Sequence, residues 1–278
     1  MSLDLTLADM NVPAHTTTVI DAGHVERIAA TLDVPVPTEV LPTMWHWMFF
    51  TPTTPTAGLG TDGHPVLDSP VLAPFPRRMF GAGTTEWDGD LRIGAVAERT
   101  TTLTSSRRVE GGSGTLRIVG LLNELSQDGE VRLRERQSIV YRAPTDDPAP
   151  LPEDGPPPAP PDGAWTEERC PAPPLLFRFS AITFNAHRIH YDLPYAREVE
   201  GHPGLVVHGP LTAWTIAEFA ERCNGARLGS FEFKATAPLY AGLRSTVVCL
   251  PPDGDGNGTA HVVRNDGAVA MQATYRLR

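Results

Sequence analysis

A proline-rich segment over residues 143–173 is the feature that most restricts how this chain can fold. Twelve of the 28 prolines lie between Pro144 and Pro174. Proline lacks the amide hydrogen that a helix or a β-ladder needs, and its ring fixes φ, so this segment excludes a helix interior and a central strand. We therefore predict a stiff, extended linker over 143–173, between a domain at 1–142 and a second domain at 174–278.

A weak internal repeat indicates that the two domains share one fold. In each half, an acidic residue and an aromatic residue precede a Leu-x-x-Gly step, and three long antiparallel strands are expected to follow. Alternation of apolar and polar residues is typical of half-buried β-strands. The matching positions are Glu86, Trp87 and 91–94 in the first half and Glu232, Phe233 and 239–242 in the second. A duplicated antiparallel sheet is the prediction.

Each sheet must cover its apolar face, so each half should contain a helix. In the second half, Gly209 fits the N-cap, Pro210 the first helical position and Gly225 the residue after the last turn. Small residues at helical spacing let a sheet curve closely around this helix: Ala213, Ile216, Ala217 and Ala220. The first-half counterpart is expected at residues 41–50, whose aromatic side chains belong to the core or line an acyl pocket.

Charge and composition limit the partners. The formal net charge of −10 repels phosphate backbones, so no nucleic acid partner is expected. No stretch reaches the roughly 20 apolar residues that span a bilayer, and the N-terminus lacks the features of a signal peptide. We therefore expect a cytoplasmic protein without a membrane partner. The three cysteines are widely spaced, which favours free thiols over disulfides or a zinc site.

Titratable side chains gather in residues 179–192, FSAITFNAHRIHYD, a segment that begins like an apolar β-strand. Histidine titrates near neutral pH and can serve as acid and base within one cycle. His187 and His190 also have the spacing of a metal-binding pair, but no cysteine or clear third ligand lies near them in the sequence. We expect proton-transfer chemistry here and no metal ion.

Two motifs, FNAHRIHYD at 184–192 and GLVVHGPL at 204–211, resemble those of the MaoC-like hydratases and dehydratases. The resemblance is closest to the group of mesaconyl-C4-CoA hydratases (3-methylfumaryl-CoA hydratases) and hydroxyacyl-thioester dehydratases type 2. Weaker matches such as GTDGHP and ERQSIVYR extend it over nearly the whole chain. It implies an α+β double hotdog fold, in which two antiparallel sheets each wrap around a central helix and pack side by side.

The resemblance also implies roles for single residues. Family members carry Asp-x-Asn-Pro-x-His, and on this sequence Asn185 stands at the aspartate position and His187 at the asparagine position. Arg188 takes the place of the proline and His190 that of the catalytic histidine. Asn185 departs from the pattern, because an amide cannot exchange protons as a carboxylate can. The mesaconyl-C4-CoA group resembles this chain in having FNAHRIHYD, so the departure does not by itself indicate an inactive protein.

The chemistry of hydration assigns the same residues. Adding water to a double bond conjugated to a thioester needs a base, a proton donor for the α-carbon and a site for the enolate oxygen. His190 can move the proton, Asn185 can orient the water, and backbone N–H groups at the helix start near Gly209 can bind the enolate oxygen. His208 is expected to fix that helix start, beside the substrate. Asp192 either orients an imidazole or caps the following turn.

Arginines are the expected contacts for an anionic ligand. Arg77 and Arg78 are candidates for the coenzyme A phosphates, although paired arginines are often solvated surface residues. Arg188, next to His187, is expected to meet a carboxylate on the acyl chain. An internal ion pair of Arg188 with Asp192 or Glu198 is the alternative.

These observations predict a cofactor-free hydro-lyase that acts reversibly on a short dicarboxylic 2-enoyl-CoA, branched or unbranched. The alternatives are dehydration of a 3-hydroxyacyl thioester on a monoacyl or acyl-carrier substrate, a non-catalytic acyl-CoA-binding module, and a hotdog thioesterase. The first domain has no counterpart of NAHRIH, so it should enclose the substrate without a catalytic group. A homo-oligomer is left open.

Overall fold

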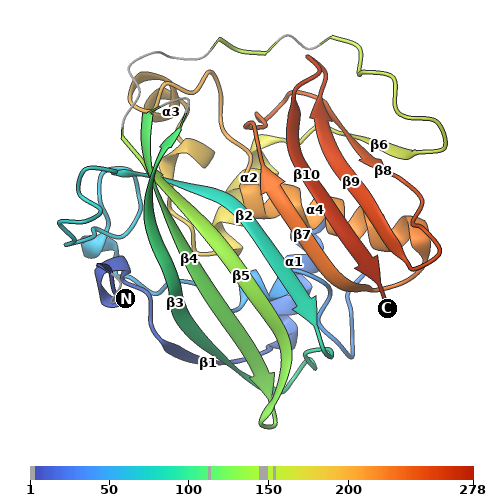
Figure 1. Cartoon of the computed structure of the whole chain (residues 1–278), viewed down its shortest axis with the longest axis horizontal. Coiled ribbons are helices and arrows are strands. Elements are labelled where there is room, and N and C mark those ends of the chain that lie inside the picture. The colour runs from blue at the N-terminus through green and yellow to red at the C-terminus, as the bar shows by residue number, and fades with distance from the viewer. Residues whose placement is uncertain (1–3, 112–113, 144–149, 153–154) are drawn as a thin grey trace.

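The computed structural model describes residues 4–111, 114–143, 150–152 and 155–278, so part of the predicted linker lies outside the described residues (Figure 1). The first half contains β1 (His15–Val19), α1 (Ala22–Leu32), β2 (Arg77–Trp87), β3 (Val96–Gly111), β4 (Gly114–Gln127) and β5 (Glu130–Arg142). The second contains β6 (Trp165–Arg169), α2 (Pro173–Ile182), α3 (Leu193–Glu198), α4 (Gly209–Asn224), β7 (Leu228–Ala235), β8 (Ser245–Cys249), β9 (Asn257–Arg264) and β10 (Val269–Leu277). Short 3₁₀ turns are η1 (Ala8–Met10), η2 (Trp45–Met48), η3 (Thr56–Gly58) and η4 (Arg188–His190).

All the named strands belong to one ten-stranded antiparallel sheet, in the order β1-β3-β4-β5-β2-β7-β10-β9-β8-β6. The order in the second half repeats that in the first half in reverse, and the two halves meet where β2 pairs with β7. Figure 1 shows the halves side by side across this seam. The predicted double hotdog is confirmed, with the two sheets joined into one surface.

The predicted Leu-x-x-Gly repeat has the same backbone structure in both halves. Gly94 and Gly242 both adopt positive φ, 84° and 79°, which glycine tolerates without strain. Equivalent hydrogen bonds surround them: Leu41 N–H to Leu91 O (2.7 Å) and Gly94 N–H to Ile20 O (2.8 Å), then Val207 N–H to Leu239 O (2.9 Å) and Gly242 N–H to Pro171 O (2.9 Å). This agreement supports the predicted duplication.

The predicted helix at 41–50 is wrong, although its position matches the start of α4. Only the 3₁₀ turn η2 forms there, because Met44 has a φ of 67° that an α-helix cannot contain. The bulky rings of Trp45 and Phe49 are buried and fill the space beside the sheet. The long helix of the first half is α1, whose N-cap Asp21 accepts the His24 N–H (2.7 Å).

The prediction that residues 179–192 begin as a strand is also wrong. The apolar run belongs to helix α2, which begins with two prolines in its first turn, where their missing N–H groups cost nothing. Leu176, Phe179 and Ser180 are buried at the i, i+3, i+4 spacing of a helix. Helix α2 packs against α1, and the chain leaves it through Phe184, which has a φ of 51°.

Helix α4 confirms the second-half prediction. Ala213, Ile216, Ala217 and Ala220 are fully buried, and the helix contacts β7, β8, β9 and β10. It ends before Gly225, which has a φ of 61°. The N-cap is His208, so Gly209 is the first helical residue and not the cap.

The end of the predicted linker contributes to the sheet. Strand β6 pairs with β8 at the sheet edge, which agrees with the exclusion of a central strand. Figure 1 shows residues 155–164, directly before β6, on the outside of the second half. The three cysteines are free thiols, as expected. Across the described part of the chain, no helix combines the length and apolar character of a membrane span.

Candidate active site

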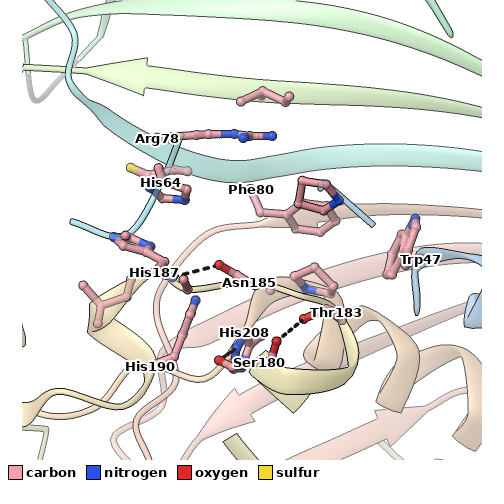
Figure 2. Close-up of a pocket in the computed structure, with 18 of the residues that line it drawn as sticks. Trp47, His64, Arg78, Phe80, Ser180, Thr183, Asn185, His187, His190 and His208 are labelled. Carbon is pink, nitrogen blue, oxygen red and sulfur yellow. Dashed lines mark hydrogen bonds between the residues drawn. The ribbon is translucent and has the colours of Figure 1, made fainter. Parts of the chain in front are cut away.

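A cleft of about 2290 Å³ lies between the two halves. Strand β2 and residues 46–65 line it from the first half, and residues 177–191, the start of α4 and the end of β7 line it from the second. In Figure 2, Arg78 and Phe80 of β2 lie across the cleft from Asn185, His190 and His208. The seam between the duplicated halves is therefore also the place where candidate site residues meet.

Four histidines form a row along this cleft. The ring centroids are 4.1 Å apart for His64 and His187, 5.5 Å for His187 and His190, and 3.6 Å for His190 and His208. His190 and His208 are stacked, with an interplanar angle of 18°. Three of the four come from the predicted segment and helix start, while His64 comes from the first half.

His190 has the environment of a neutral imidazole. It belongs to η4, is 6% exposed, and its Nδ1 lies 2.7 Å from the Val206 carbonyl oxygen, which can only accept. Nδ1 therefore carries the hydrogen and Nε2 keeps its lone pair. Burial, followed by the nearby His208, holds the pKa of His190 well below its usual range. His190 is thus neutral at neutral pH and has a lone pair that can accept a proton.

Asn185 is held by its backbone neighbours. Its N–H donates to the Ser180 carbonyl (2.8 Å), and its Oδ1 accepts the His187 N–H (3.0 Å). Its side-chain NH₂ has no hydrogen-bond partner among the residues that the structure describes. With Oδ1 occupied, Asn185 presents donors to a ligand or water.

The start of α4 is built around His208 and Gly209. His208 Nε2 lies 2.9 Å from Ser180 Oγ, and burial lowers the pKa of His208 to about 3. A Cβ on Gly209 would lie 2.7 Å from the ring of Phe80, so glycine permits the close approach of β2. Pro210 has no N–H, so Gly209 and Leu211 supply the first-turn N–H groups, which have no partner within the helix and carry the positive end of its dipole. An oxyanion fits this position.

His187 and Arg77 are both joined to the loop that follows α3. His187 Nε2 lies 3.3 Å from Glu200 Oε1. Arg77 donates to the carbonyl oxygens of Val199 (3.0 Å) and Glu200 (3.1 Å). Burial alone would raise the pKa of Glu200, but the His187 hydrogen bond and Arg77 lower it overall. These contacts shape the rim of the cleft.

Arg78 differs from Arg77. It is half-buried and lines the cleft, and within the described ranges no hydrogen bond or ion pair joins its guanidinium to another residue. Its charge lowers the pKa of His64. Arg78 therefore has its donors available for an anion.

Arg188 makes the internal pair that the sequence left as an alternative. Its Nε and Nη2 donate to Asp192 Oδ2 (3.0 and 2.7 Å), and its Nη1 donates to the Thr61 carbonyl (2.9 Å). Asp192 also caps α3 by accepting the Tyr195 N–H (3.1 Å). Recognition of a substrate carboxylate by Arg188 stays a prediction.

The sequence interpretation gave no role to Asp62 and expected no catalytic role for His64. His64 Nδ1 lies 3.0 Å from Asp62 Oδ2, and burial lowers the pKa of His64 to about 4. Asp62, His64 and His187 each offer a ligand atom within 4.8 Å of the others, as in a metal site. His64 and His187 each already use one ring nitrogen toward Asp62 and Glu200, and the absence of a metal stays a prediction. The only sequence signal was the weak GTDGHP match.

Comparison with known proteins identifies the family. The sequence profile of hydroxyacyl-thioester dehydratase type 2 matches residues 44–241. A mesaconyl-C(4)-CoA hydratase from Chloroflexus aurantiacus is 41% identical over 255 residues, which cover 90% of this chain and 89% of that protein.

Two solved structures share the fold. A MaoC-like dehydratase from Phytophthora capsici has a TM-score of 0.70 at 15% identity and covers 95% of both chains. A Mycobacterium tuberculosis protein described as a double hotdog has a TM-score of 0.57 at 12% identity, over 98% of this chain and 99% of that one. With the profile match and the 41% identical relative, they show that this chain belongs to the hydroxyacyl-thioester dehydratase type 2 family of hydro-lyases.

Proposed function

We propose that the protein reversibly adds water to a short dicarboxylic 2-enoyl-CoA of the mesaconyl type. The observation that carries this proposal is that a neutral His190, with a free lone pair on Nε2, and the side-chain NH₂ of Asn185 line the same cleft as the start of α4. Figure 2 shows the His190 ring directed towards Asn185 and His187. The relative that is named for mesaconyl-C(4)-CoA supports the acyl group.

The proposed chemistry begins with the thioester oxygen bound at the Gly209 end of α4. The Asn185 NH₂ donates to a water, and His190 Nε2 takes one proton from it as the water oxygen bonds to C3. The π electrons move to the thioester oxygen, where N–H groups of the first turn stabilise the enolate. Protonation of C2 then completes the addition, and the reverse sequence is dehydration.

The aromatic residues of the first half are proposed to help enclose the substrate. Trp47 packs edge-on against Phe80 (centroids 5.5 Å) and Phe233 (6.1 Å), which places an aromatic wall across the seam. Apolar walls exclude water and strengthen the interactions with the enolate. The acyl chain is expected to lie against this wall.

The anionic groups of the substrate need cations within an acidic protein. Arg78 is the stronger candidate for the acyl carboxylate because its guanidinium is available in the cleft, whereas that of Arg188 is bound to Asp192. Arg77 remains a candidate for coenzyme A phosphate contacts at the rim. No cofactor, nucleic acid or membrane partner is part of this proposal, and a cytoplasmic location and a homo-oligomer remain expectations.

A panel of 2-enoyl-CoA substrates tests the function. We expect loss of the enoyl-thioester absorbance to be fastest with the branched dicarboxylic substrate. Faster turnover of a monoacyl substrate would favour the dehydratase alternative. Tight binding measured by calorimetry without an absorbance change would indicate a binding module, and release of free thiol would indicate a thioesterase.

A further inference from the structure

A loop of the first half, residues 60–65, is docked on the catalytic segment of the second half. The Arg188 N–H donates to the Asp62 carbonyl (2.9 Å), and the Arg188 side chain donates to the Thr61 carbonyl (2.9 Å). The same guanidinium is fixed by Asp192. Arg188 therefore joins the loop to η4, between the two predicted catalytic positions in the sequence, Asn185 and His190.

Gly63 shows how closely the two segments approach. It has a φ of 90°, and a Cβ at this position would lie 1.7 Å from the Ala186 carbonyl oxygen. No side chain fits that gap, and an L-residue would be strained by the backbone angle as well. The fit is specific to glycine, so the loop is seated at a defined position against residues 185–190.

The loop holds His64 in one orientation. The Gly60 N–H donates to the His64 carbonyl (2.7 Å), and the His64 N–H donates to Asp62 Oδ1 (3.0 Å). The other oxygen of Asp62 lies 3.0 Å from His64 Nδ1, so Nδ1 carries the hydrogen. Nε2 has no hydrogen-bond partner in the described part of the chain and keeps its lone pair. Figure 2 shows His64 beside His187, at the cleft.

Hydration moves two protons. In the second half, His187 lies against Glu200 and His208 against Ser180, which leaves His190 to move one of them. His190 can take the proton of water, but Asn185 cannot supply or remove a proton at C2. The carboxylate that the wider family has at this position is absent. A carboxylate paired with a histidine and aimed at the same cleft meets this need.

Resting on the proposed function, we propose that the Asp62–His64 pair is the second acid–base group of the site and that His64 exchanges the proton of C2. In dehydration, the C2–H bond breaks, its proton goes to His64 Nε2, and its electron pair forms the enolate. The C3–O bond then breaks, and the oxygen leaves as water with a proton from the His190 imidazolium. Hydration is the reverse, in which His190 takes a proton from water and His64 gives one to C2.

The productive complex therefore needs one proton on His64 and His190 together. This proton is on His64 for hydration and on His190 for dehydration. The groups that face His64 are Asp62 from its own loop, Arg78 from β2, and His187, which is bonded to Glu200. Burial, His187 and Arg78 lower the pKa of His64, whereas Asp62 raises it. A substrate carboxylate at Arg78 would offset the effect of that arginine, so proton uptake on binding is expected.

Three variants and a control test this proposal with the full chain. His64→Gln, His64→Ala and Asp62→Asn are compared with wild type and with His261→Gln, which changes a half-buried histidine of β9 outside the cleft. His64→Gln should lower kcat by about 100-fold to 10,000-fold, with KM within a few-fold of wild type. In hydration, the alkaline limb of the kcat profile should move to lower pH in Asp62→Asn, because the carboxylate no longer stabilises the imidazolium. Added imidazole should restore part of the activity of His64→Ala, which a purely structural role would not allow.

The outcomes separate this proposal from the proposed function. Wild type without hydratase activity on any enoyl-CoA would refute the function itself. An active wild type, with His64→Gln at the same kcat and with the same pH profile, would refute only the role of His64. If His64→Gln fails to fold, an unshifted profile in Asp62→Asn refutes the pairing.

Dialysis against a chelator adds an independent check. We expect wild-type activity to survive this treatment. Loss of activity that Zn²⁺ restores would instead assign Asp62, His64 and His187 to a metal site.

Discussion

The two halves share a scaffold but differ in where their connections lengthen. In the first half, residues 33–39 join α1 to the bridge between Val40 and Arg92, while in the second half residues 183–205 join α2 to the equivalent bridge between Val206 and Tyr240. The longer connection carries η4 and α3. Conversely, residues 49–76 join η2 to β2 in the first half, whereas only residues 225–227 join α4 to β7 in the second half. Each half thus extends a different connection, and the two extensions meet where Arg188 binds Asp62.

This difference teaches how a duplicated fold can form one asymmetric site. The repeated Leu-x-x-Gly turns and strand order preserve the scaffold in both halves. Most of the proposed site residues lie in the connections, which can lengthen without disturbing the sheet. The second half supplies His190 and Asn185, and the first supplies the loop at 60–65 together with Arg78. The variants below test whether the halves contribute as unequally as this arrangement indicates.

The largest effect is expected for His190→Ala. Removing the proposed proton acceptor should lower kcat by about 100-fold to 10,000-fold. A modest loss of thermal stability is expected because the ring stacks on His208. Stopped-flow absorbance measures the rate, with His15→Ala on the exposed strand β1 as the control. A wild-type rate in His190→Ala would refute His190 as the proton acceptor and leave it as a structural residue.

Arg78→Ala and Arg188→Ala test which of the two arginines binds the acyl carboxylate of the substrate. Loss of an available guanidinium at Arg78 should raise KM about 10-fold or more for the dicarboxylic substrate and much less for a monoacyl one. Arg188→Ala should reduce turnover of both substrates alike, since it releases the loop at 60–65. Steady-state kinetics on both substrates decide between them. If KM rose only for the dicarboxylic substrate in Arg188→Ala, and not in Arg78→Ala, the carboxylate would be assigned to Arg188.

Gly63→Ala tests whether activity requires the loop at 60–65 to pack against residues 185–190. Gly267→Ala is the matched control, because Gly267 also has a positive φ (86°) but has nothing within 4 Å of a built Cβ. Backbone strain alone should cost each variant about 1–3 kcal/mol of unfolding free energy. Gly63→Ala should also lose activity, because its Cβ would collide with the Ala186 carbonyl. Denaturant unfolding and kcat are the measurements, and equal activity in the two variants would contradict the docking.

We expect the free energy of unfolding to fall at acid pH because of the buried histidines at the seam. His64 and His208 have folded pKa values of about 4 and about 3, below the ordinary value of 6.5. At pH values between these folded pKa values and 6.5, the unfolded chain binds more protons than the folded one. Stability therefore falls as pH falls from about 6.5 towards 4. Denaturant unfolding at several pH values should show a shallower slope for His64→Gln than for wild type. An unchanged slope would show that His64 titrates alike in both states.

Asn185→Asp should have the smallest effect on rate. It restores the family carboxylate and is expected to keep activity. A carboxylate near His190 raises the pKa of the imidazole, so the acid limb of the hydration profile, which depends on neutral His190, should move to higher pH. A pH–rate profile measures this. An unshifted limb would show that residue 185 does not act on His190.

Local signals in the sequence predicted the scaffold, but long-range contacts decided the rest. Small residues at helical spacing gave α4, and the proline-rich segment excluded a central strand, which agrees with the position of β6 at the sheet edge. The 41–50 helix failed because the backbone at Met44 is left-handed, which its sequence does not signal. The strand expected from Phe179 failed because the two prolines before it start a helix.

The candidate site also contains residues that local motifs predict and residues that only long-range contacts bring together. His190, Asn185 and Gly209 lie within a short stretch of sequence and could be proposed from their motifs. Asp62 and His64 lie far from them in the chain, and their relation to the cleft depends on the approach of Gly63 to Ala186. No local pattern encodes that contact. The sequence likewise left the internal pairing of Arg188 as one of two alternatives, and the structure pairs Arg188 with Asp192.

The central claim is that the seam between the halves adds water to a dicarboxylic enoyl-CoA. The most direct test is to incubate the protein with mesaconyl-C4-CoA in ¹⁸O-labelled water and analyse the thioester by mass spectrometry. We expect a product that has gained one water with the label on C3, formed faster than the product of a monoacyl enoyl-CoA. Recovery of unchanged mesaconyl-C4-CoA, or of free coenzyme A with a labelled acid, would contradict it.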